Sequence, residues 1–173
     1  LLRGAGVSDI RVLDGGLSAW RATGLPLETG DVSPEPGSIL FDGVEEGISI
    51  DEAAAWPQRG VLLDARAPER YRGESEPFDP VAGHIPGAVN LPADAVLDGA
   101  SFAPPATIRA AFESVGVSDL TSVAAYCGSG LTAAHTALAG AAAGLDVAVY
   151  PGSWSQWSNT AGRPVATGAE PGA

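Results

Sequence analysis

The chain has 173 residues, a net charge of −12 and a single cysteine, and 45% of its residues are hydrophobic. This length is enough for one full hydrophobic core with some chain to spare. The negative charge argues against nucleic acid or an anionic membrane as a partner, and no apolar run approaches the roughly 18 residues of a membrane span. One cysteine gives no disulfide framework, so we expect a protein of the reducing cytoplasm.

The first 30 residues carry a pattern that returns at the end of the chain. The segment VLDGGLSAW at 12–20 aligns with VYPGSWSQW at 149–157 at an offset of 137 positions. Further on, GLPLETG at 24–30 aligns with GRPVATG at 162–168. Each copy predicts a strand, a glycine turn, a short helix with a tryptophan and an extended exit. Chance similarity is the alternative, but two matches in the same order favour tandem domains of similar size.

The repeat predicts how the chain is divided. Residues 1–30 would be the C-terminal tail of a first domain. The sequence starts at Leu1 and contains no methionine, so we expect an internal piece of a longer protein. Residues 31–37 are polar and rich in Pro and Gly, as in a linker. The second domain would then cover 38–168, followed by a short tail at 169–173.

The second domain alternates predicted strands and helices. Strands or extended segments are predicted at 38–41, 61–64, 88–91, 122–126 and 147–150. Helices are predicted at 49–56, 68–72, 104–115 and 133–143, with a final short helix that carries tryptophans. The first of these helices begins with a capping box formed by Ser49 and Glu52. The alternation predicts an α/β fold with a mainly parallel five-stranded sheet flanked by helices on both faces.

The single cysteine, Cys127, follows a predicted buried strand and precedes a Gly-Ser-Gly loop and an Ala-rich helix. Ligands of parallel sheets bind beyond such strand ends. A loop of this form points backbone N–H groups and the positive end of a helix dipole at its centre, and Gly128 and Gly130 let the backbone curl tightly. We therefore predict a cradle for an anionic sulfur, with a cysteine that merely packs as the alternative.

Two other chemistries fit the Cys127 loop less well. A nest of N–H groups also binds phosphate, but cysteine phosphatases carry an arginine six residues after the nucleophile, where this chain has Ala133. One cysteine and two widely separated histidines, His84 and His135, do not make a metal site. We expect no metal and no cofactor.

Further motifs resemble one family, the rhodanese domain. The segments that carry the resemblance are DAR at 64–66, ERYRG at 69–73, AGHIPGAVNLP at 82–92, CGSGLTA at 127–133 and YPGSWSQW at 150–157. In this order and spacing they are most similar to the C-terminal, catalytic domain of tandem-rhodanese sulfurtransferases. Residues 1–30 resemble the end of that family's inactive first domain.

The resemblance implies a sulfurtransferase that works without a cofactor. Cys127 would attack the outer sulfur of a small anionic donor, carry it as a persulfide and pass it to cyanide or a thiol. The backbone of the loop would cradle the anionic sulfur. The residues expected to form this cradle are Gly128, Ser129, Gly130, Leu131 and Thr132.

The resemblance also suggests roles for four charged residues. Arg70 matches the family arginine that contacts the anionic group of the donor. Arg72 lies nearby and is expected either to assist Arg70 or to be a solvated surface charge. Arg66 is expected to brace the loop or the sheet edge, and Asp64 to order the loop by accepting hydrogen bonds. The histidine of the GHIP motif, His84, is expected to be architectural.

The loop composition addresses the donor. Thiosulfate-type rhodaneses carry basic residues in the cysteine loop, whereas the uncharged loop here resembles the 3-mercaptopyruvate type, with Leu131 where valine is usual. In that type Ser129 belongs to a hydroxyl relay whose partners lie outside this chain. That type also has an arginine after Glu-Pro, but Phe78 follows Glu76-Pro77. We expect 3-mercaptopyruvate as the favoured donor and thiosulfate as the next.

Two other functions use the same fold. A persulfide carrier would pass its sulfur to a protein acceptor, and a non-catalytic rhodanese domain would only bind a protein partner. The intact Cys127 and its glycine-rich loop argue against the second. Because the first domain would normally cover part of the catalytic domain, we also expect self-association of this piece and weak activity without its partner domain.

Overall fold

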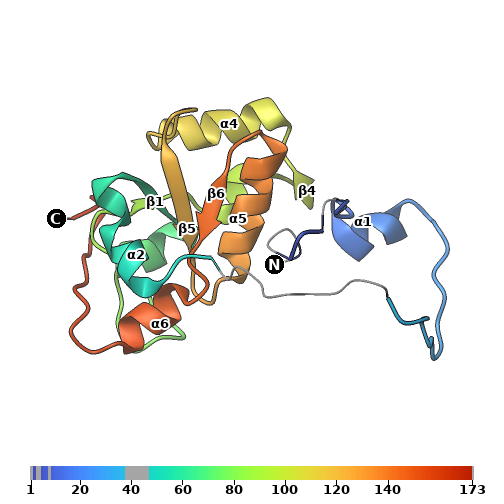
Figure 1. Cartoon of the computed structure of the whole chain (residues 1–173), viewed down its shortest axis with the longest axis horizontal. Helices are drawn as coiled ribbons and strands as arrows, with labels where there is room; N and C mark the ends of the chain where they lie inside the picture. Colours follow the sequence, from blue (N-terminus) through green and yellow to red (C-terminus); the bar gives the residue numbers. More distant parts are fainter. Residues whose placement is uncertain (1, 3–4, 8, 38–46, 173) are drawn as a thin grey trace. The chain divides into compact units, whose positions relative to one another are not determined.

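The computed structural model describes residues 2, 5–7, 9–37 and 47–172. The chain divides into two units (Figure 1): Leu1–Glu46 with Gly99–Phe102, and Gly47–Asp98 with Ala103–Ala173. The first is called unit 1 and the second unit 2. The domain boundaries expected from the sequence stay predictions.

Unit 2 is built on a parallel sheet of four strands in the order β2-β1-β5-β6. These strands are β1 (Gly60–Asp64), β2 (Val89–Asn90), β5 (Ser122–Tyr126) and β6 (Val147–Val149). The two remaining short strands are β3 (Leu97–Asp98), in unit 2, and β4 (Ser101–Phe102), in unit 1. The predicted α/β fold with a parallel sheet is confirmed. Of the five expected strands, the one at 38–41 lies outside the described residues.

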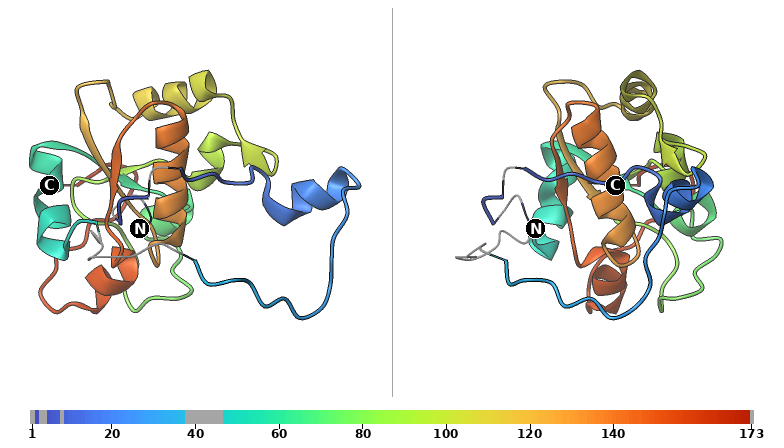
Figure 2. Two further views of the ribbon diagram at one scale, coloured as in Figure 1. Left: turned by 45° about the vertical axis from the view of Figure 1, so that its right-hand side comes forward. Right: turned by 90° about the vertical axis from the view of Figure 1, so that its right-hand side faces the viewer.

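Helices cover both faces of the sheet (Figure 2). Leu62, Ala124 and Tyr126 point to one face, because side chains alternate along a strand, and they pack against Trp154 and Trp157. The helices and 3-10 turns of unit 2 are α2 (Ile50–Ala55), η1 (Trp56–Gln58), α3 (Pro68–Tyr71), η2 (Ala93–Val96), α4 (Pro105–Ser114), α5 (Leu131–Ala142) and α6 (Ser153–Asn159).

On the opposite face, α5 packs closely on β6. A Cβ added at Gly140 would lie 2.7 Å from a methyl group of Val147 and 3.5 Å from the ring of Phe112 on α4. The absence of a side chain at this position therefore lets the helix approach the sheet.

The predicted capping box of α2 is confirmed. The Ser49 N–H donates to Glu52 Oε2 at 2.7 Å, and the Glu52 N–H donates to Ser49 Oγ at 3.2 Å. Hydrogen bonds from the backbone and then the side chain of Ser49 lower the pKa of Glu52. This local pattern fixes where the helix begins.

The strand register prepares the site. β1 and β5 run side by side with Asp64 opposite Tyr126, and Val123 to Ala125 pair with 147 to 149 of β6. The carboxyl ends of β1 and β5 therefore meet at the same edge of the sheet. The Ala65 N–H extends the pairing by donating to the carbonyl of Tyr126 at 2.9 Å, one residue before Cys127.

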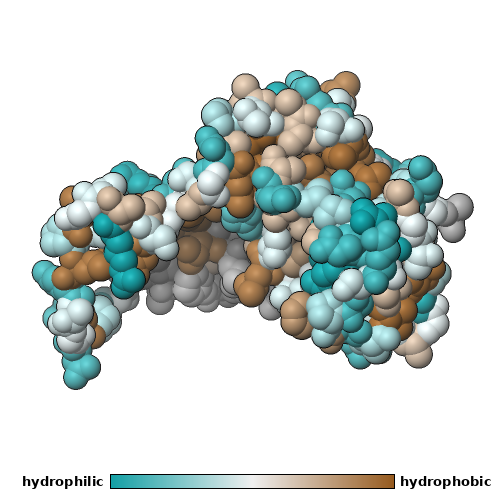
Figure 3. All heavy atoms as spheres, turned by 180° about the vertical axis from the view of Figure 1, so that it is seen from behind, coloured by the Kyte–Doolittle hydropathy of each residue, from teal (hydrophilic) through white to brown (hydrophobic). Residues whose placement is uncertain are grey.

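Unit 1 contains a short helix, α1 (Gly16–Ala22), that buries none of its residues. The strand expected before it is wrong, because none forms in the described stretch 9–37. A strand is stable only when it pairs with neighbours. Apolar side chains such as Leu13 and Leu17 stay about half exposed, at 55% and 52%. Figure 3 colours one face of the molecule by residue hydropathy and shows hydrophobic residues (brown) among hydrophilic ones (teal).

Among the described helices, none is long and apolar enough to cross a membrane. The expected cytoplasmic location stays a prediction.

Candidate active site

Cys127 lies between β5 and α5 and is buried, with 2% of its surface exposed. Two backbone hydrogen bonds fix this segment from the side of α6. The Trp154 N–H donates to the carbonyl of Cys127, and the Ser155 N–H donates to the carbonyl of Gly128, both at 2.9 Å. The carbonyls are thereby turned toward α6, and the loop after Cys127 is held by the start of a second helix.

The backbone N–H groups of the loop remain available. Those of residues 128–133 donate to no acceptor within the described chain. They include the first N–H groups of α5, which lack partners inside the helix and lie at the positive end of its dipole. By contrast, the Cys127 N–H donates to Ser153 Oγ at 3.1 Å. A set of open donors following one buried thiol is a site suited to an anionic sulfur.

Gly130 makes the loop geometry feasible. It adopts φ +85°, in the left-handed region that favours glycine, directly before α5. A Cβ here would lie 2.6 Å from the carbonyl oxygen of Pro151. A larger residue would therefore push the loop away from the segment that follows β6.

Arg70 on α3 supplies a cation beside the loop. A Cβ built on Gly128 would lie 3.4 Å from Arg70 Nη1 and 3.5 Å from Nη2, so the guanidinium lies beside Gly128, on the side where a larger residue would carry its side chain. Arg70 Nη2 donates to Glu76 Oε1 at 2.7 Å and lies 3.8 Å from a carboxylate oxygen of Asp79. The guanidinium also lies 5.2 Å from the ring centre of Phe78, which is 81% exposed.

A buried ion-pair cluster positions Arg70. Arg66 binds both carboxylate oxygens of Asp64, and its Nη1 donates to Glu76 Oε2 at 3.1 Å. Glu76 thus bridges Arg66 in the core and Arg70 beside the loop. Burial acts to raise the pKa of Glu76, but hydrogen bonds from Arg70 and the backbone of Phe78, with the charges of Arg70 and Arg66, hold it below its ordinary value.

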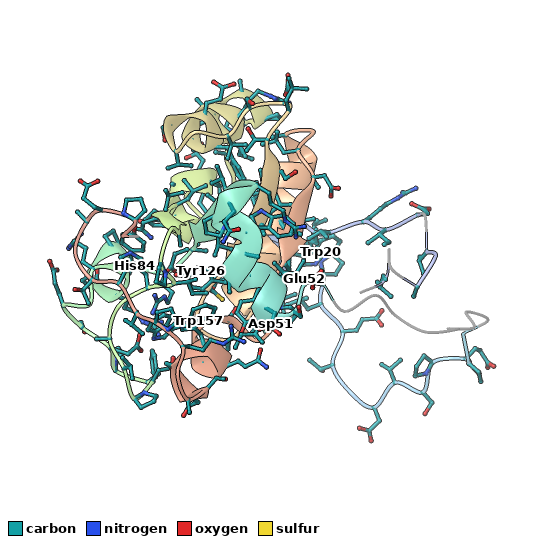
Figure 4. The ribbon with its side chains drawn as sticks, turned by 60° about the vertical axis from the view of Figure 1, so that its left-hand side comes forward. Trp20, Asp51, Glu52, His84, Tyr126 and Trp157 are labelled. Carbon is teal, nitrogen blue, oxygen red and sulfur yellow. The ribbon has the colours of Figure 1, made fainter. Side chains whose placement is uncertain are left out.

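Arg66, the member of this cluster that lies in the core, makes two further contacts. Arg66 Nη2 donates to the carbonyl of Gly83 at 2.7 Å, and the guanidinium lies 4.5 Å from the ring centre of Trp154. Burial acts to lower the pKa of Arg66, and the hydrogen bonds and charge of Asp64 outweigh it, so the net shift is upward. Figure 4 labels Tyr126, at the end of β5, and Trp157, on α6. Burial, followed by the charge of Asp64, raises the pKa of Tyr126.

The comparison with known families decides the classification. The sequence model of the rhodanese-like domain matches residues 49–160. The chain belongs to the rhodanese-like domain family. The match includes the Cys127 loop, the Arg66 and Arg70 cluster and the start of α6, which are the parts of the candidate site of this rhodanese domain.

Relatives of this rhodanese domain carry sulfurtransferase names. The chain is 44% identical over 173 residues to the putative thiosulfate sulfurtransferase SseB of Mycobacterium tuberculosis, across 97% of this chain and 61% of that protein. It is 44% identical over 172 residues to the probable 3-mercaptopyruvate sulfurtransferase of Pseudomonas aeruginosa, across 92% of this chain and 58% of that protein. The chain thus spans 58% to 61% of the length of these relatives.

A solved structure agrees in fold. The crystal structure of SseA from Escherichia coli, described as a 3-mercaptopyruvate sulfotransferase with a rhodanese fold, matches with a TM-score of 0.75 and 30% identity. The match covers 89% of this chain and 60% of that chain.

The sequence-predicted residues of the rhodanese site fall into two groups. The structure brings Arg70 against the Cys127 loop and joins Arg66 to Asp64 behind it. It does not bring Arg72 there: its guanidinium donates both Nε and Nη2 to Glu74 on the surface. The roles expected for these four residues, Asp64, Arg66, Arg70 and Arg72, stay predictions.

The histidine of the GHIP motif lies away from the loop contacts. His84 is fully buried, its ring stacks on Tyr71 with 3.8 Å between ring centres, and its Nδ1 lies 2.8 Å from the carbonyl of Tyr71. Its backbone pairs with Ala166. These contacts join the α3 region to the C-terminal segment of the rhodanese domain.

Sequence reasoning missed two residues of this rhodanese site. Glu76 enters the sequence analysis only as part of Glu-Pro, and its burial between Arg66 and Arg70 is a property of the folded chain with no local sequence signal. Ser153 was noted only as part of the Trp segment. Its signal lay in the repeat, where Gly16 takes the equivalent position.

Proposed function

We propose that this domain catalyses transfer of a sulfane sulfur from a small anionic donor, with 3-mercaptopyruvate favoured over thiosulfate, to cyanide or a thiol. The observation that carries the proposal is the buried Cys127 followed by the open N–H groups of 128–133, with the Arg70 guanidinium beside Gly128. The sulfurtransferase names of the relatives support it.

In the first step the Cys127 thiolate attacks the sulfur of the donor. With 3-mercaptopyruvate the new S–S bond forms as the C–S bond breaks, the thiol proton of the donor ends on carbon, and pyruvate leaves. With thiosulfate the S–S bond of the donor breaks and sulfite leaves. In both cases Cys127 becomes an anionic persulfide, and the loop N–H groups stabilise its terminal sulfur by hydrogen bonds.

In the second step an acceptor removes the outer sulfur. Cyanide attacks that sulfur, the Cys–S–S bond breaks, thiocyanate leaves, and the Cys127 thiolate is restored. In both half-reactions the electron pair of the broken bond leaves with the departing group, so no external oxidant or reductant is needed. Covalent catalysis of this kind divides one transfer into two displacements at the same sulfur.

The charges beside the loop favour a monoanionic donor. Residues 128–133 carry no charged side chain, so the loop itself offers only N–H dipoles. Arg70 is partly neutralised by Glu76 and by Asp79. Because Nε and Nη2 of Arg70 already donate to Glu76, the positive charge left for a donor suits the single carboxylate of 3-mercaptopyruvate better than the dianion thiosulfate.

The test is intact mass after incubation with 3-mercaptopyruvate and, separately, with thiosulfate. The wild-type protein is expected to gain the mass of one sulfur atom, faster with 3-mercaptopyruvate, and Cys127→Ser is expected to gain none. Absence of the adduct with both donors would contradict the proposed activity. Faster loading by thiosulfate would contradict the donor assignment alone.

A second variant sharpens the donor assignment. Phe78 lies against Arg70, so Phe78→Arg places another guanidinium beside the donor position. We expect this variant to lower the donor KM about tenfold, which corresponds to about 1.4 kcal/mol of added binding. Leu120→Arg is the matched control, because Leu120 is 97% exposed and precedes β5 at the end opposite Cys127. Equal effects of the two variants would show nonspecific attraction of anions.

A further inference from the structure

Ser153 has a backbone conformation that serine rarely adopts. Its φ is +52°, and it is the only residue other than glycine with a positive φ in the described part of the chain. In the repeat, its counterpart at the offset of 137 positions is Gly16, which has φ +60°. The residues before them differ, with φ +75° at Gly15 and φ −63° at Gly152, so the two turns are not identical. The equivalent position with positive φ is nevertheless occupied once by glycine, which adopts it freely, and once by serine, which is strained there.

The side chain of Ser153 makes two hydrogen bonds that glycine could not make. Its Oγ accepts from the Cys127 N–H at 3.1 Å and donates to the carbonyl of Tyr150 at 2.9 Å. Ser153 is fully buried, so no solvent competes for these bonds. The hydroxyl thus ties the backbone of Cys127 to the segment that leaves β6.

Because of this contact, the backbone N–H groups near the Cys127 sulfur fall into two sets. The N–H of Cys127 is turned to Ser153, whereas those of 128–133 donate to no acceptor in the described chain. If the hydroxyl were absent, the buried N–H of Cys127 would lack its acceptor, and the peptide plane before the loop would lose one of its fixed points. The orientation of the open N–H groups depends on that plane.

We propose that the Ser153 hydroxyl is a positioning group that fixes the Cys127 backbone so that the loop N–H groups converge on the sulfur. The inference rests on the proposed sulfur transfer and deepens it. A purely architectural turn residue would be better served by glycine, as at Gly16. A strained residue that is retained for its side-chain contacts is expected where geometry matters to chemistry.

The experiment compares Ser153→Gly and Ser153→Ala with Ser158→Ala. Glycine removes the hydroxyl and relieves the strain, whereas alanine removes the hydroxyl and keeps the strain. Ser158→Ala is the matched control, because Ser158 lies on the same helix and its hydroxyl has no hydrogen-bond partner among the described residues. Each protein is assayed for steady-state thiocyanate formation from 3-mercaptopyruvate and cyanide.

Both Ser153 variants are expected to lower kcat about tenfold and to change the donor KM less than twofold, because Arg70 is held by Glu76 and not by Ser153. The control should match the wild type. Ser153→Gly with wild-type kcat would overturn the proposal, since the hydroxyl would then be dispensable for catalysis.

A second readout separates this inference from the proposed function. The rate at which iodoacetamide alkylates Cys127 is measured without any donor. Both Ser153 variants are expected to react about fivefold more slowly than the wild type and Ser158→Ala, because the loop N–H groups stabilise the thiolate less well. Equal alkylation rates would overturn the role of Ser153, even in a protein that takes no sulfur from either donor. A wild type that loads no sulfur would instead refute the proposed function.

Discussion

The segments 12–30 and 149–168, which share a sequence pattern and are called the first and second copy, have several local contacts in common and different surroundings. In both, the tryptophan side chain donates from Nε1 to a proline carbonyl: Trp20 to Pro26 at 3.0 Å and Trp157 to Pro164 at 2.9 Å. In both, a threonine N–H donates to the tryptophan carbonyl, from Thr23 at 3.3 Å and from Thr160 at 3.1 Å. The first copy buries no residue of its helix, whereas the second buries Ser153, Trp154 and Trp157.

This difference shows that the shared pattern determines a short helix and the hydrogen bonds at its end, but not the turn before the helix or the environment of the helix. In the second copy β6 joins the sheet, so α6 packs on it and its first N–H groups hold the Cys127 loop. In the first copy no strand precedes the helix within the described residues. The local motif thus becomes part of a site only where a sheet supports it.

The largest expected contrast is in stability. Trp157 is 1% exposed and Trp20 is half-buried, so Trp157→Ala is expected to cost about 3–5 kcal/mol and Trp20→Ala about 1 kcal/mol or less. Urea unfolding followed by circular dichroism measures both. Similar losses for the two variants would show that the first copy is packed as tightly as the second.

A second contrast concerns the buried charges next to the second copy, where Arg66 lies on the Trp154 ring and pairs with Glu76. Replacing Glu76 by Gln is expected to cost about 3 kcal/mol at neutral pH, because it leaves two arginines without their shared partner. Since the folded-state pKa of Glu76 lies below its ordinary value of 4.5, its stabilisation is complete above that value. It is lost as the pH falls through the lower folded-state pKa.

The measurement is the difference in unfolding free energy between wild type and Glu76→Gln from pH 7 to the acid limit of folding. The difference should shrink only below about pH 4.5. Glu28→Gln, an exposed change in the first copy, serves as the control with little effect at any pH. A constant difference across the whole range would contradict the bridging role of Glu76.

The smallest effect is expected from Gly16→Ser, which gives the first copy the residue of the second. A Cβ at Gly16 meets nothing within 4 Å, so the cost is conformational, about 1 kcal/mol at φ +60°. Amide hydrogen exchange in α1 should report it. If Gly16→Ser stabilised α1 instead, the new serine would have found hydrogen-bond partners in the first copy. Serine contacts at this position would then not be particular to Ser153.

Much of the fold could be predicted from the sequence because its signals are local. The capping box of Ser49 and Glu52, the apolar run before Cys127 and the glycines of its loop each specify an element within a few residues. The strand expected near Val12 was wrong because strand formation depends on pairing, which a local pattern does not contain.

The candidate site was likewise predictable only where its residues are adjacent in the sequence. Cys127 and its loop are contiguous, so they were found. The bridge from Arg66 through Glu76 to Arg70 and the bond from Cys127 to Ser153 join residues that are brought together by β1, α3 and β6. Only the packed chain reveals that Arg72 turns to Glu74 while Arg70 faces the loop.

The most direct test of the central claim is discharge of the isolated persulfide. The protein is loaded with 3-mercaptopyruvate, freed of donor, and mixed with cyanide, and both intact mass and thiocyanate are followed over time. We predict that one thiocyanate appears for each sulfur lost and that the mass returns to that of the unmodified chain at the same rate. An adduct that persists in cyanide, with no thiocyanate formed, would contradict Cys127 as the carrier of the transferred sulfur.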